Sequence, residues 1–496
     1  MDNIGIIRNA KKIIVYGAGR GGKILLERLW DEVQDKDVEV WDASYDEIDS
    51  ICGFSVLKPC FEHRKNCSDV VVLISLYGKN INASKEIRLK FLNHGYKNVI
   101  LFDDIWIMKV NKDKPSAYDE SPYQANMDFS SFESKVKSIA FYLPQYHEVI
   151  ENSEWWGEGF TEWVNTKKAK PRFRGHYQPR EPHDDIGYYD LSDVEAIKKQ
   201  ARLAKQHGIY GWAIYYYWFS GKKILYKPID ILFENKDIDI KFCLTWCNNP
   251  WTKEWIGKGS EVLIENKYLE NDPISFIDDI SEYLKDTRYI KFDDKPLIII
   301  YSAHTIPNIK ELLFAWRKRA HEIGIGDIAI FSALNPISIQ DMGLQGYLEG
   351  ELVFAPTEQK KARVHMNCFP QISMDNRIFL YESLFDEYRR FISSNDSNIY
   401  HCSMCGWDNS ARYDDNFRML DFGFTFKLFY HMTKFIAEDA ERHDKEFIFV
   451  FAWNEWAEAA YLEPDKRFGY AMINTFSKAI YGLPFEWRNN EGEGDA

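Results

Sequence analysis

Residues 192–218 read SDVEAIKKQARLAKQHGIYGWAIYYYW and contain one predicted helix followed directly by one predicted strand. The helical part ends at Gly208, and glycine is common just past the end of a helix. The second part, from Tyr210, is an apolar and aromatic run of strand length. A further strand, SIAFYLPQY from Ser138, precedes this unit. The order strand, helix, strand indicates a parallel sheet.

The same alternation continues along the rest of the chain, where eight strands can be counted in all. The remaining six are KFCLTWC from Lys241, PLIIIYS from Pro296, IAIFSAL from Ile328, GYLEGELV from Gly346, IYHCSMCGW from Ile399 and FIFVFAWNEW from Phe447. Eight strand–helix units in about 350 residues are typical of a (β/α)8 TIM barrel, which carries its active site at the C-terminal ends of the strands. We therefore predict an α/β protein with such a barrel over residues 137–488.

A smaller unit is predicted ahead of the barrel, because 496 residues exceed what one hydrophobic core usually serves. Residues 1–112 alternate strands and helices and predict a small Rossmann-like parallel α/β domain. Residues 113–136 are polar and lack either period, so we expect a linker. Residues 489–496 are expected to form a disordered tail.

The composition excludes several classes of function. The net charge of -14 repels phosphate backbones, so nucleic acid is not an expected partner. No segment resembles a signal peptide or reaches the length of a transmembrane helix, which predicts a cytoplasmic protein. No histidine or cysteine spacing of a metal site is found, so no metal is expected. Aromatic residues make up 16% of the chain, which suits either sugar stacking or an aromatic-rich core.

The last predicted strand carries the sharpest candidate site, in FAWNEWAEAAYLEPD. Glu455 follows the strand and Glu458 comes three residues later, which puts two carboxylates at the mouth of the barrel. Glycosidic chemistry needs one carboxyl that is protonated and one that is ionised. Trp453 and Trp456 are expected to supply apolar walls that raise one pKa and not the other. The alternative is a pair of solvated glutamates in a surface loop.

Polar and aromatic residues also end the other strands, and a loop of some forty residues follows the first strand. Loops this long are usually functional, although a hydrophobic lid over the barrel is the alternative. Residues that cap the next turn are the alternative at single strand ends. The predicted substrate-binding residues are Gln145, Tyr146, His147, Trp155, Trp156, Glu162, Trp163, His176, Tyr177, Tyr216, Trp218, Trp246, Asn248, Glu349, Trp407, Asp408, Asn409, Trp453, Asn454 and Trp456.

The N-terminal unit contains a G-x-G-x-x-G motif. Gly17, Gly19 and Gly22 follow the strand KKIIVY, and Asp42 lies at the end of the next strand. This is the context of a dinucleotide site, so these four residues are candidates for binding a nucleotide, NAD or a nucleotide sugar. Tight packing would require the same glycines. No cofactor is expected to be needed by the barrel.

The chain resembles the WbsX-type glycosyltransferases of bacterial surface-polysaccharide gene clusters. The resemblance covers about residues 137–485 and is carried by FYLPQYH, EWWGEGFTEW, GHYQPREP, GYYDL, GWDN and WNEWAEAAYLEPD. That family in turn looks like a distant relative of the endo-α-mannosidase and endomannanase glycoside hydrolases, which are barrels with an E-x-x-E pair at a strand end. The chain departs from the WbsX-like pattern at Ala459, where glycine is usual.

The resemblance implies a function in O-antigen or capsule biosynthesis, with Glu455 as base and Glu458 as acid. It implies a glycan or nucleotide-sugar substrate and association with other polysaccharide-assembly enzymes. The N-terminal unit itself resembles the sugar-nucleotide or dinucleotide-like modules attached to many polysaccharide-biosynthesis enzymes. A retaining endo-glycosidase and a non-catalytic glycan-binding protein stay open as alternatives.

Overall fold

The structure is a computed structural model of the 496-residue chain. It divides into two compact units, one of Met1–Ala117 with Asn367–Phe379 and the other of Tyr118–Met366 with Leu380–Ala496. The described residues are 3–19, 22–23, 25–26, 29–61, 67–76, 81–101, 123–171, 176–253, 261–268, 272–333, 338–354, 377–381, 398–413 and 417–485.

The N-terminal unit is built on one six-stranded sheet with the order β3-β4-β2-β1-β5-β6. Its elements are α1 (Asn3–Arg8), β1 (Lys12–Tyr16), α3 (Trp30–Val33), β2 (Asp37–Trp41), β3 (Ser50–Ile51), β4 (Phe54–Leu57), β5 (Cys67–Ile74), α4 (Ile81–Asn93) and β6 (Tyr96–Leu101). All neighbouring pairs are parallel except β3 with β4. The five parallel strands, numbered along the chain, therefore lie in the order 3-2-1-4-5. This confirms the Rossmann-like prediction.

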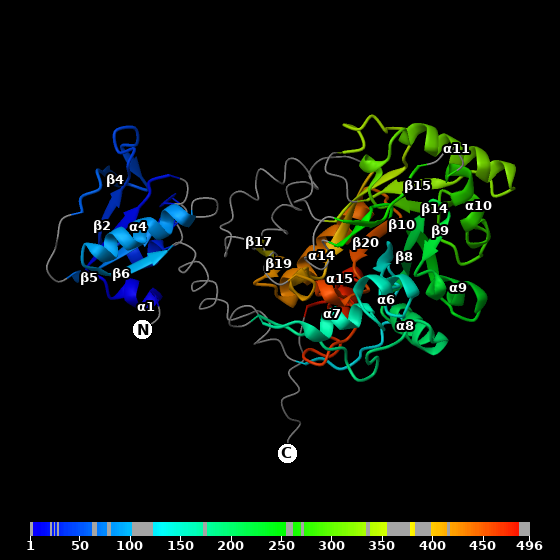
Figure 1. Ribbon diagram of the computed structural model, residues 1–496. Helices are drawn as coiled ribbons and strands as arrows, with labels where there is room; N and C mark the ends of the chain where they lie inside the picture. Colours follow the sequence, from blue (N-terminus) through cyan, green and yellow to red (C-terminus); the bar gives the residue numbers. More distant parts are fainter. Residues whose placement is uncertain are drawn as a thin grey trace, which may run out of the picture. The chain divides into compact units, whose positions relative to one another are not determined.

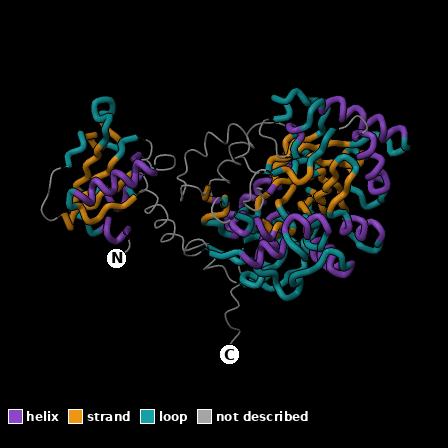
Figure 2. Tube along the Cα trace, viewed as in Figure 1, coloured by secondary structure: helices purple, strands orange, loops and turns teal. Residues whose placement is uncertain are grey.

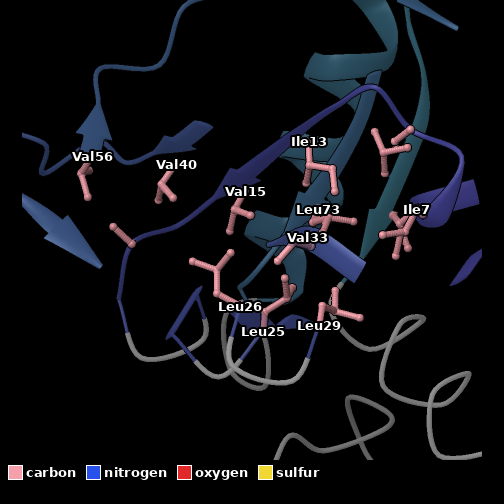
Figure 3. Packing of buried hydrophobic residues seen from close by; sticks show 14 residues of the cluster. Ile7, Ile13, Val15, Leu25, Leu26, Leu29, Val33, Val40, Val56 and Leu73 are labelled. Carbon is pink, nitrogen blue, oxygen red and sulfur yellow. The ribbon is translucent and has the colours of Figure 1, made fainter. Parts of the chain in front are cut away.

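Both faces of this sheet are buried. Successive residues of a strand point to opposite sides of the sheet, so neighbouring residues of β1 pack in two different clusters. Ile13 and Val15 of β1 pack with Leu25, Leu26 and further aliphatic residues on one face (Figure 3). Ile14, between them in the sequence, packs on the other face with Trp41 and Phe91. The apolar run IIVY at residues 13–16 is thus explained by a parallel strand covered on both sides.

The larger unit is a closed barrel of eight parallel strands. They are β7 (Lys137–Tyr142), β8 (Ile209–Phe219), β10 (Lys241–Trp246), β14 (Lys295–Ile300), β15 (Ala329–Ser332), β16 (Gly350–Val353), β18 (Ile399–Met404) and β20 (Phe447–Phe451). Each strand pairs in parallel with the next one along the chain, β20 pairs with β7, and β8 pairs with β10. All eight predicted strands are confirmed, and helices lie outside them (Figures 1 and 2).

The helices and minor elements of this unit lie between and beyond the barrel strands. They are α6 (Ile150–Trp156), α7 (Glu162–Lys168), α8 (Val194–Gln206), β9 (Lys222–Ile224), α9 (Lys227–Glu234), β11 (Trp251–Thr252), β12 (Val262–Ile264), α10 (Asp272–Leu284), β13 (Lys291–Phe292), η3 (Ala303–Thr305), α11 (Ile309–Glu322), η5 (Asn409–Ala411), β19 (Arg418–Phe422), α14 (Phe426–Arg442), β21 (Asn454–Glu455), η6 (Trp456–Glu458), β22 (Ala460–Tyr461) and α15 (Ala471–Ile480). The short strand β17 (Arg377–Leu380) falls at the division between the two units, after Phe379. No described helix has the length and apolar character that crossing a membrane requires.

The expected linker is described only from residue 123 onward. In that part, the Gln124 amide donates to the Phe468 carbonyl at 3.0 Å, and the Tyr470 amide donates back to Gln124 at 2.9 Å. Phe129 is 1% exposed, and its amide donates to the Gln206 carbonyl at 3.1 Å. Residues 123–136 therefore belong to the barrel unit. Residues 113–122 of the expected linker and the expected tail at 489–496 lie outside the described residues.

Candidate active site

Both candidate glutamates lie on a small hairpin that follows the eighth strand, β20. Glu455 ends β21, Glu458 ends η6, and β22 returns so that Glu455 pairs with Ala460. The Asn454 side chain ties this hairpin to the loop after β7, because its Oδ1 accepts from the Leu143 amide at 2.7 Å and its Nδ2 donates to the Leu143 carbonyl at 3.0 Å. The Tyr146 hydroxyl donates to the Asn454 carbonyl at 2.5 Å. Asn454 and Tyr146 thus hold the backbone on which the glutamates stand.

Three carboxylates meet at one guanidinium, that of Arg412. Arg412 Nε donates to Glu162 Oε1 at 3.0 Å, and Nη2 donates to Glu455 Oε2 at 3.1 Å. Nη1 makes a short contact with Glu458 Oε1. Glu162 comes from α7, so three separate segments contribute to the cluster. The structure therefore brings together Glu162, Glu455 and Glu458 of the predicted residues.

The two glutamates of the pair differ in their surroundings. The Glu455 side chain is 6% exposed, whereas that of Glu458 is 15% exposed. Burial, and next the nearby Glu458 carboxylate, raise the pKa of Glu455 to about 8, although the Arg412 guanidinium acts in the opposite direction. Both oxygens of Glu458 accept hydrogen bonds, one from Arg412 and the other from Trp407 Nε1 at 2.8 Å.

Asp408 and His176 lie beside the cluster in a structural role. His176 Nε2 and Asp408 Oδ2 are 2.7 Å apart, and both side chains are fully buried. Gln178 and the Ser410 amide also donate to Asp408, which caps η5. Burial opposes ionisation of Asp408, but these hydrogen bonds and the charge of His176 keep its pKa below the ordinary value. Asn409 likewise serves the loop, since its Oδ1 accepts from the Arg418 amide at 2.7 Å.

Three predicted aromatic residues, Tyr216, Trp218 and Trp246, lie on the outside of the barrel and not in the site. Trp218 and Trp246 pack against Phe276 of α10, with ring centroids 5.4 and 5.0 Å apart, and Tyr216 bonds to Asp279 of the same helix. A strand turns alternate residues to opposite faces. The prediction used residue type without this alternation and therefore selected the wrong face.

Tyr215 and Tyr217 occupy the inward face of β8. Burial chiefly raises the pKa of both hydroxyls, and the charge of Glu455 adds to the rise. Cys247, just after β10, responds to Glu455 in the same way. These residues and Tyr146 surround Glu455 with neutral groups in an apolar setting.

The long first loop supplies an aromatic surface and a buried support. Trp155 and Trp156 are half-buried, and Trp155 meets Trp251 edge to face at 5.8 Å. Trp251 in turn meets Tyr217 at 5.0 Å, so this surface, which we call the aromatic wall (Trp155, Trp156, Trp251 and Tyr217), leads to the inner face of β8. Trp163 is buried and donates to the Tyr189 carbonyl at 2.8 Å, so it belongs to the support.

The remaining predicted tryptophans of the last loop are fully buried. Trp456 stacks on Tyr461 at 3.9 Å, and its Nε1 donates to Glu463 Oε2 at 2.7 Å. Trp453 lies 6.1 Å from the Trp212 ring. These contacts direct Trp456 toward Glu463, and Trp453 toward Trp212, which lies on the same face of β8 as Tyr216 and Trp218. The expectation that the two rings form apolar walls of Glu455 is therefore not confirmed.

Four further predicted residues, Gln145, His147, Tyr177 and Asn248, make contacts within and between loops. Gln145 is buried, and its carbonyl accepts from the Glu162 amide at 3.0 Å. His147 Nδ1 bonds to the Pro144 carbonyl at 2.9 Å, and burial lowers its pKa. Tyr177 lies between the guanidiniums of Arg180 and Arg467. Asn248 ties its loop to Ser302 through two hydrogen bonds.

Glu349 was expected at the C-terminal end of the sixth strand, and this placement was wrong. β16 begins at Gly350, so Glu349 lies at the opposite end of the barrel from Glu455. It pairs with Arg317 of α11 at 3.0 Å and accepts from the Ile330 amide at 2.7 Å. The stretch GYLEGELV allows several strand registers, and the sequence alone did not distinguish them.

The glycine motif of the N-terminal unit lies where β1 and β5 meet, at the point where the strand order reverses. A Cβ on Gly17 would lie 2.3 Å from Ser75 Oγ, and one on Gly22 would lie 2.1 Å from the Gly17 carbonyl oxygen. A Cβ on Gly19 would meet nothing within 4 Å. Asp42 accepts from the Ala18 amide at 2.5 Å and from the Ser44 amide at 2.8 Å.

Arg412, Tyr215 and Trp251 were missed by the sequence reasoning. Arg412 stands four residues after Asp408 in GWDNSAR, but it reaches Glu162 across 250 positions of the chain. Its only sequence signal was a basic residue next to a strand-end motif. Strand alternation separates Tyr215 and Tyr217 from Tyr216 and Trp218, but it does not show which set faces inward. Among the described residues, no cluster of three histidine, cysteine or carboxylate groups suits a metal ion.

The fold and this cluster define a (β/α)8 barrel with an acidic site at the C-terminal ends of its strands, which is where such barrels carry their active sites. Residues 138–476 match the family described as glycosyltransferase WbsX, and the chain belongs to that family.

Two curated relatives are proteins named WxcX and described as uncharacterized. WxcX of Xanthomonas campestris pv. campestris (strain B100) is 33% identical over 354 residues, covering 70% of this chain and 50% of that protein. WxcX of a second strain of the same organism is 33% identical over 356 residues, with the same coverage. The chain thus spans about half the length of the curated relatives it matches.

Solved structures with a similar fold include a glycoside hydrolase-like protein and an endo-alpha-mannosidase. The former has a TM-score of 0.45 at 12% identity and covers 74% of this chain and 99% of that one. The latter, from Bacteroides thetaiotaomicron, has a TM-score of 0.41 at 14% identity and covers 70% of this chain and 96% of that one.

Proposed function

We propose that this chain is a carbohydrate-active enzyme of bacterial surface-polysaccharide assembly, which forms or breaks a glycosidic bond with Glu455 and Glu458 as its acid–base pair. The observation that carries the proposal is the pair itself: two carboxyls of unequal burial, held by one guanidinium at the mouth of a barrel. Membership of the WbsX family supports the substrate class.

The surroundings of the pair favour Glu455 as the proton donor. Both oxygens of Glu458 accept hydrogen bonds, from Arg412 and from Trp407, which orients this carboxyl as an acceptor. Glu455 is more deeply buried, and burial favours the neutral form. In this assignment Glu455 protonates the leaving oxygen, while Glu458 acts as the base or nucleophile on the sugar. It is the reverse of the assignment that the family resemblance implied.

The two assignments predict opposite pH dependence. Because the pKa of Glu455 is raised to about 8, an acid role makes kcat/KM fall as pH rises through that value, and a base role makes it rise. A substrate with a strongly acidic leaving group needs little protonation. It should therefore rescue Glu455→Gln and not Glu458→Gln if Glu455 is the acid.

The wall of Trp155, Trp156, Trp251 and Tyr217 supports a sugar substrate. The indoles of Trp155 and Trp156 are partly exposed and suit the C–H faces of sugar rings, while Trp251 and Tyr217 are buried behind them. The negative charge of the glutamate cluster would also stabilise the positive charge that develops at the anomeric carbon in glycosidic chemistry. Both features apply equally to transfer and to hydrolysis.

Product analysis tests the proposal and separates its two forms. The purified protein is incubated with a panel of nucleotide sugars and with the producing cell's own polysaccharide. Release of a nucleotide with a new linkage identifies a glycosyltransferase. Release of oligosaccharide without a nucleotide sugar identifies an endo-glycosidase. Tight glycan binding with no product from either mixture would contradict an enzyme and favour a glycan-binding protein.

The matched variants for an observed activity are Glu455→Gln, Glu458→Gln and Glu349→Gln. Loss of a general acid or base lowers the rate by about 10²- to 10⁴-fold, so the first two variants should lose activity to that extent. Glu349 lies at the other end of the barrel, and its variant should keep wild-type turnover per folded molecule. Near-wild-type turnover in both Glu455→Gln and Glu458→Gln would exclude the pair as the catalytic groups.

A second proposal concerns the N-terminal unit, which we infer to bind a nucleotide, NAD or a nucleotide sugar. The supporting observation is that the three glycines differ as in dinucleotide folds: Gly17 and Gly22 allow close packing, and Gly19 faces open space. Calorimetry with NAD and nucleotide sugars tests it. Gly19→Val should remove binding and leave thermal unfolding unchanged, and a wild-type chain that binds none of these compounds would contradict it.

A further inference from the structure

Arg412 contacts all three carboxylates of the cluster through different nitrogens. Nε bonds to Glu162, while Nη1 and Nη2 point at Glu458 and Glu455. A guanidinium is planar and rigid, so its nitrogens fix the groups that bind to them. We propose that Arg412 is the positioning residue of this site, which fixes Glu455 and Glu458 relative to each other and through its charge decides how readily Glu455 keeps its proton.

The chain holds Arg412 firmly against the glutamate hairpin. Three short elements carry the cluster: α7 with Glu162, η5 followed by Arg412, and η6 with Glu458. They meet at three small buried residues that pack together, Ala169, Ala411 and Ala457. The Asp408 amide donates to the Glu458 carbonyl at 2.7 Å, which joins the η5 and η6 segments directly.

A close backbone approach reinforces this junction. A Cβ on Gly406 would lie 2.8 Å from the Ala459 carbonyl oxygen, so the strand end before Arg412 is in contact with the turn after Glu458. The Arg412 side chain is 8% exposed, and its carboxylate partners are also largely buried. Charges in such a setting are screened much less than charges at the surface.

The groups around Glu455 come from several elements. Glu458 and Glu162 are the acidic groups, and both favour a protonated Glu455, whereas Arg412 opposes it. Tyr146 after β7, Tyr215 and Tyr217 on β8, and Cys247 after β10 also interact with Glu455. Burial raises the pKa of each of these four, so they stay neutral around neutral pH.

Removal of the positive charge and removal of a negative charge should therefore act in opposite directions. Arg412→Gln should raise the pKa of Glu455, and Glu162→Gln should lower it, each by about one to three pH units for a unit charge at this distance. Arg412→Lys keeps the charge and loses the planar fork, so it should hold the pKa of Glu455 near the wild-type value. A purely structural disturbance would have no such sign pattern.

The measurement is an infrared difference titration of the ligand-free full-length protein. The protonated-carboxyl band that disappears in Glu455→Gln reports Glu455, and its midpoint is compared among wild type, Arg412→Gln, Arg412→Lys and Glu162→Gln. Opposite shifts in Arg412→Gln and Glu162→Gln, with Arg412→Lys close to wild type, support the proposal. Shifts of the same sign, or equal shifts in Arg412→Gln and Arg412→Lys, overturn it.

The titration needs no substrate, so its outcome does not depend on the proposed glycosidic activity. Only the expected effect of Arg412 variants on kcat rests on that activity. If Arg412→Gln does not fold, Arg412→Lys and Glu162→Gln carry the test. A midpoint unchanged in Glu162→Gln would then overturn the proposal, and a lower midpoint there, with Arg412→Lys close to wild type, would support it. On a verified substrate, Arg412→Lys should lower kcat with little change in KM, because positioning is lost while charge is kept.

Discussion

A buried carboxyl with a raised pKa lowers the stability of the folded state at high pH, and Glu455 is the example at the acidic site. Its pKa is about 8 in the folded chain and 4.5 in an ordinary setting, so between these values the folded state binds more protons than the unfolded state. Stability then falls as pH rises through this window. The sequence predicted the pair, because strand-end carboxylates between tryptophans are conspicuous. It assigned the walls to those tryptophans, whereas the buried groups that interact with Glu455 are Tyr146, Tyr215, Tyr217 and Cys247. It did not predict which glutamate is the more buried.

Glu455→Gln should therefore unfold less easily than wild type at pH 8 to 9. The difference in unfolding free energy should grow from about pH 4.5 to about 8, reaching on the order of a few kcal/mol. Urea titrations across pH measure it. Glu463→Gln is a matched comparison, because burial raises the pKa of Glu463 to about 7 and the same growth should end there. A pH-independent difference for Glu455→Gln would contradict the raised pKa.

The backbone conformation at Ala459 explains why glycine is usual at this position in the family pattern. Its φ is +51°, in the left-handed region that glycine adopts without strain. Ala459→Gly should raise the unfolding free energy by about 1 kcal/mol, since relief of strain exceeds the added entropy of the unfolded chain. Ala457→Gly, two residues earlier in η6, is the control and should lower stability. Chemical denaturation of both variants checks the opposite signs.

At the scale of elements, the strands could be predicted from the sequence. The prediction did not consider which face of each strand points into the barrel. Most of the eight strands are bounded apolar runs, which a sequence shows well, whereas β16 contains Glu351 and was placed in the wrong register. Whether Tyr215 or Tyr216 faces inward depends on the register of β8, which is set by pairing with strands distant in the sequence. The short elements η5 and η6 were also out of reach, because contacts between them and not their local sequence place Arg412.

The two kinds of tryptophan should respond differently to truncation. Trp246 is buried against Phe276 and Trp316, so Trp246→Ala should cost about 3 to 5 kcal/mol of stability. Trp155 is half-buried in the aromatic wall, so Trp155→Ala should cost less stability and should weaken glycan binding. Thermal unfolding and calorimetry with the verified glycan distinguish them. Unchanged binding by folded Trp155→Ala would indicate that the wall is only a lid.

At the scale of the whole molecule, the division into two units followed from chain length and the repeated alternation of strands and helices. The exact boundary could not be predicted in this way. The segment before the barrel is polar, as a linker is, although single residues in it pack against the barrel unit. Phe129 packs between His207 and Tyr481, at ring distances of 5.6 and 6.1 Å. One buried aromatic ring in a polar segment leaves no periodic signal.

The boundary can be tested with two fragments of the barrel unit. A fragment of residues 118–496 retains Phe129 and the backbone hydrogen bonds of Gln124, whereas a fragment of residues 137–496 loses both. Burial of a phenylalanine contributes about 1.5 to 3 kcal/mol, and each backbone hydrogen bond about 0.5 to 1.5 kcal/mol. The shorter fragment should therefore unfold at a clearly lower temperature in calorimetry, and Phe129→Ala in the full chain should reproduce part of that loss. Equal unfolding temperatures for the two fragments would instead extend the linker to residue 136, as its composition alone predicts.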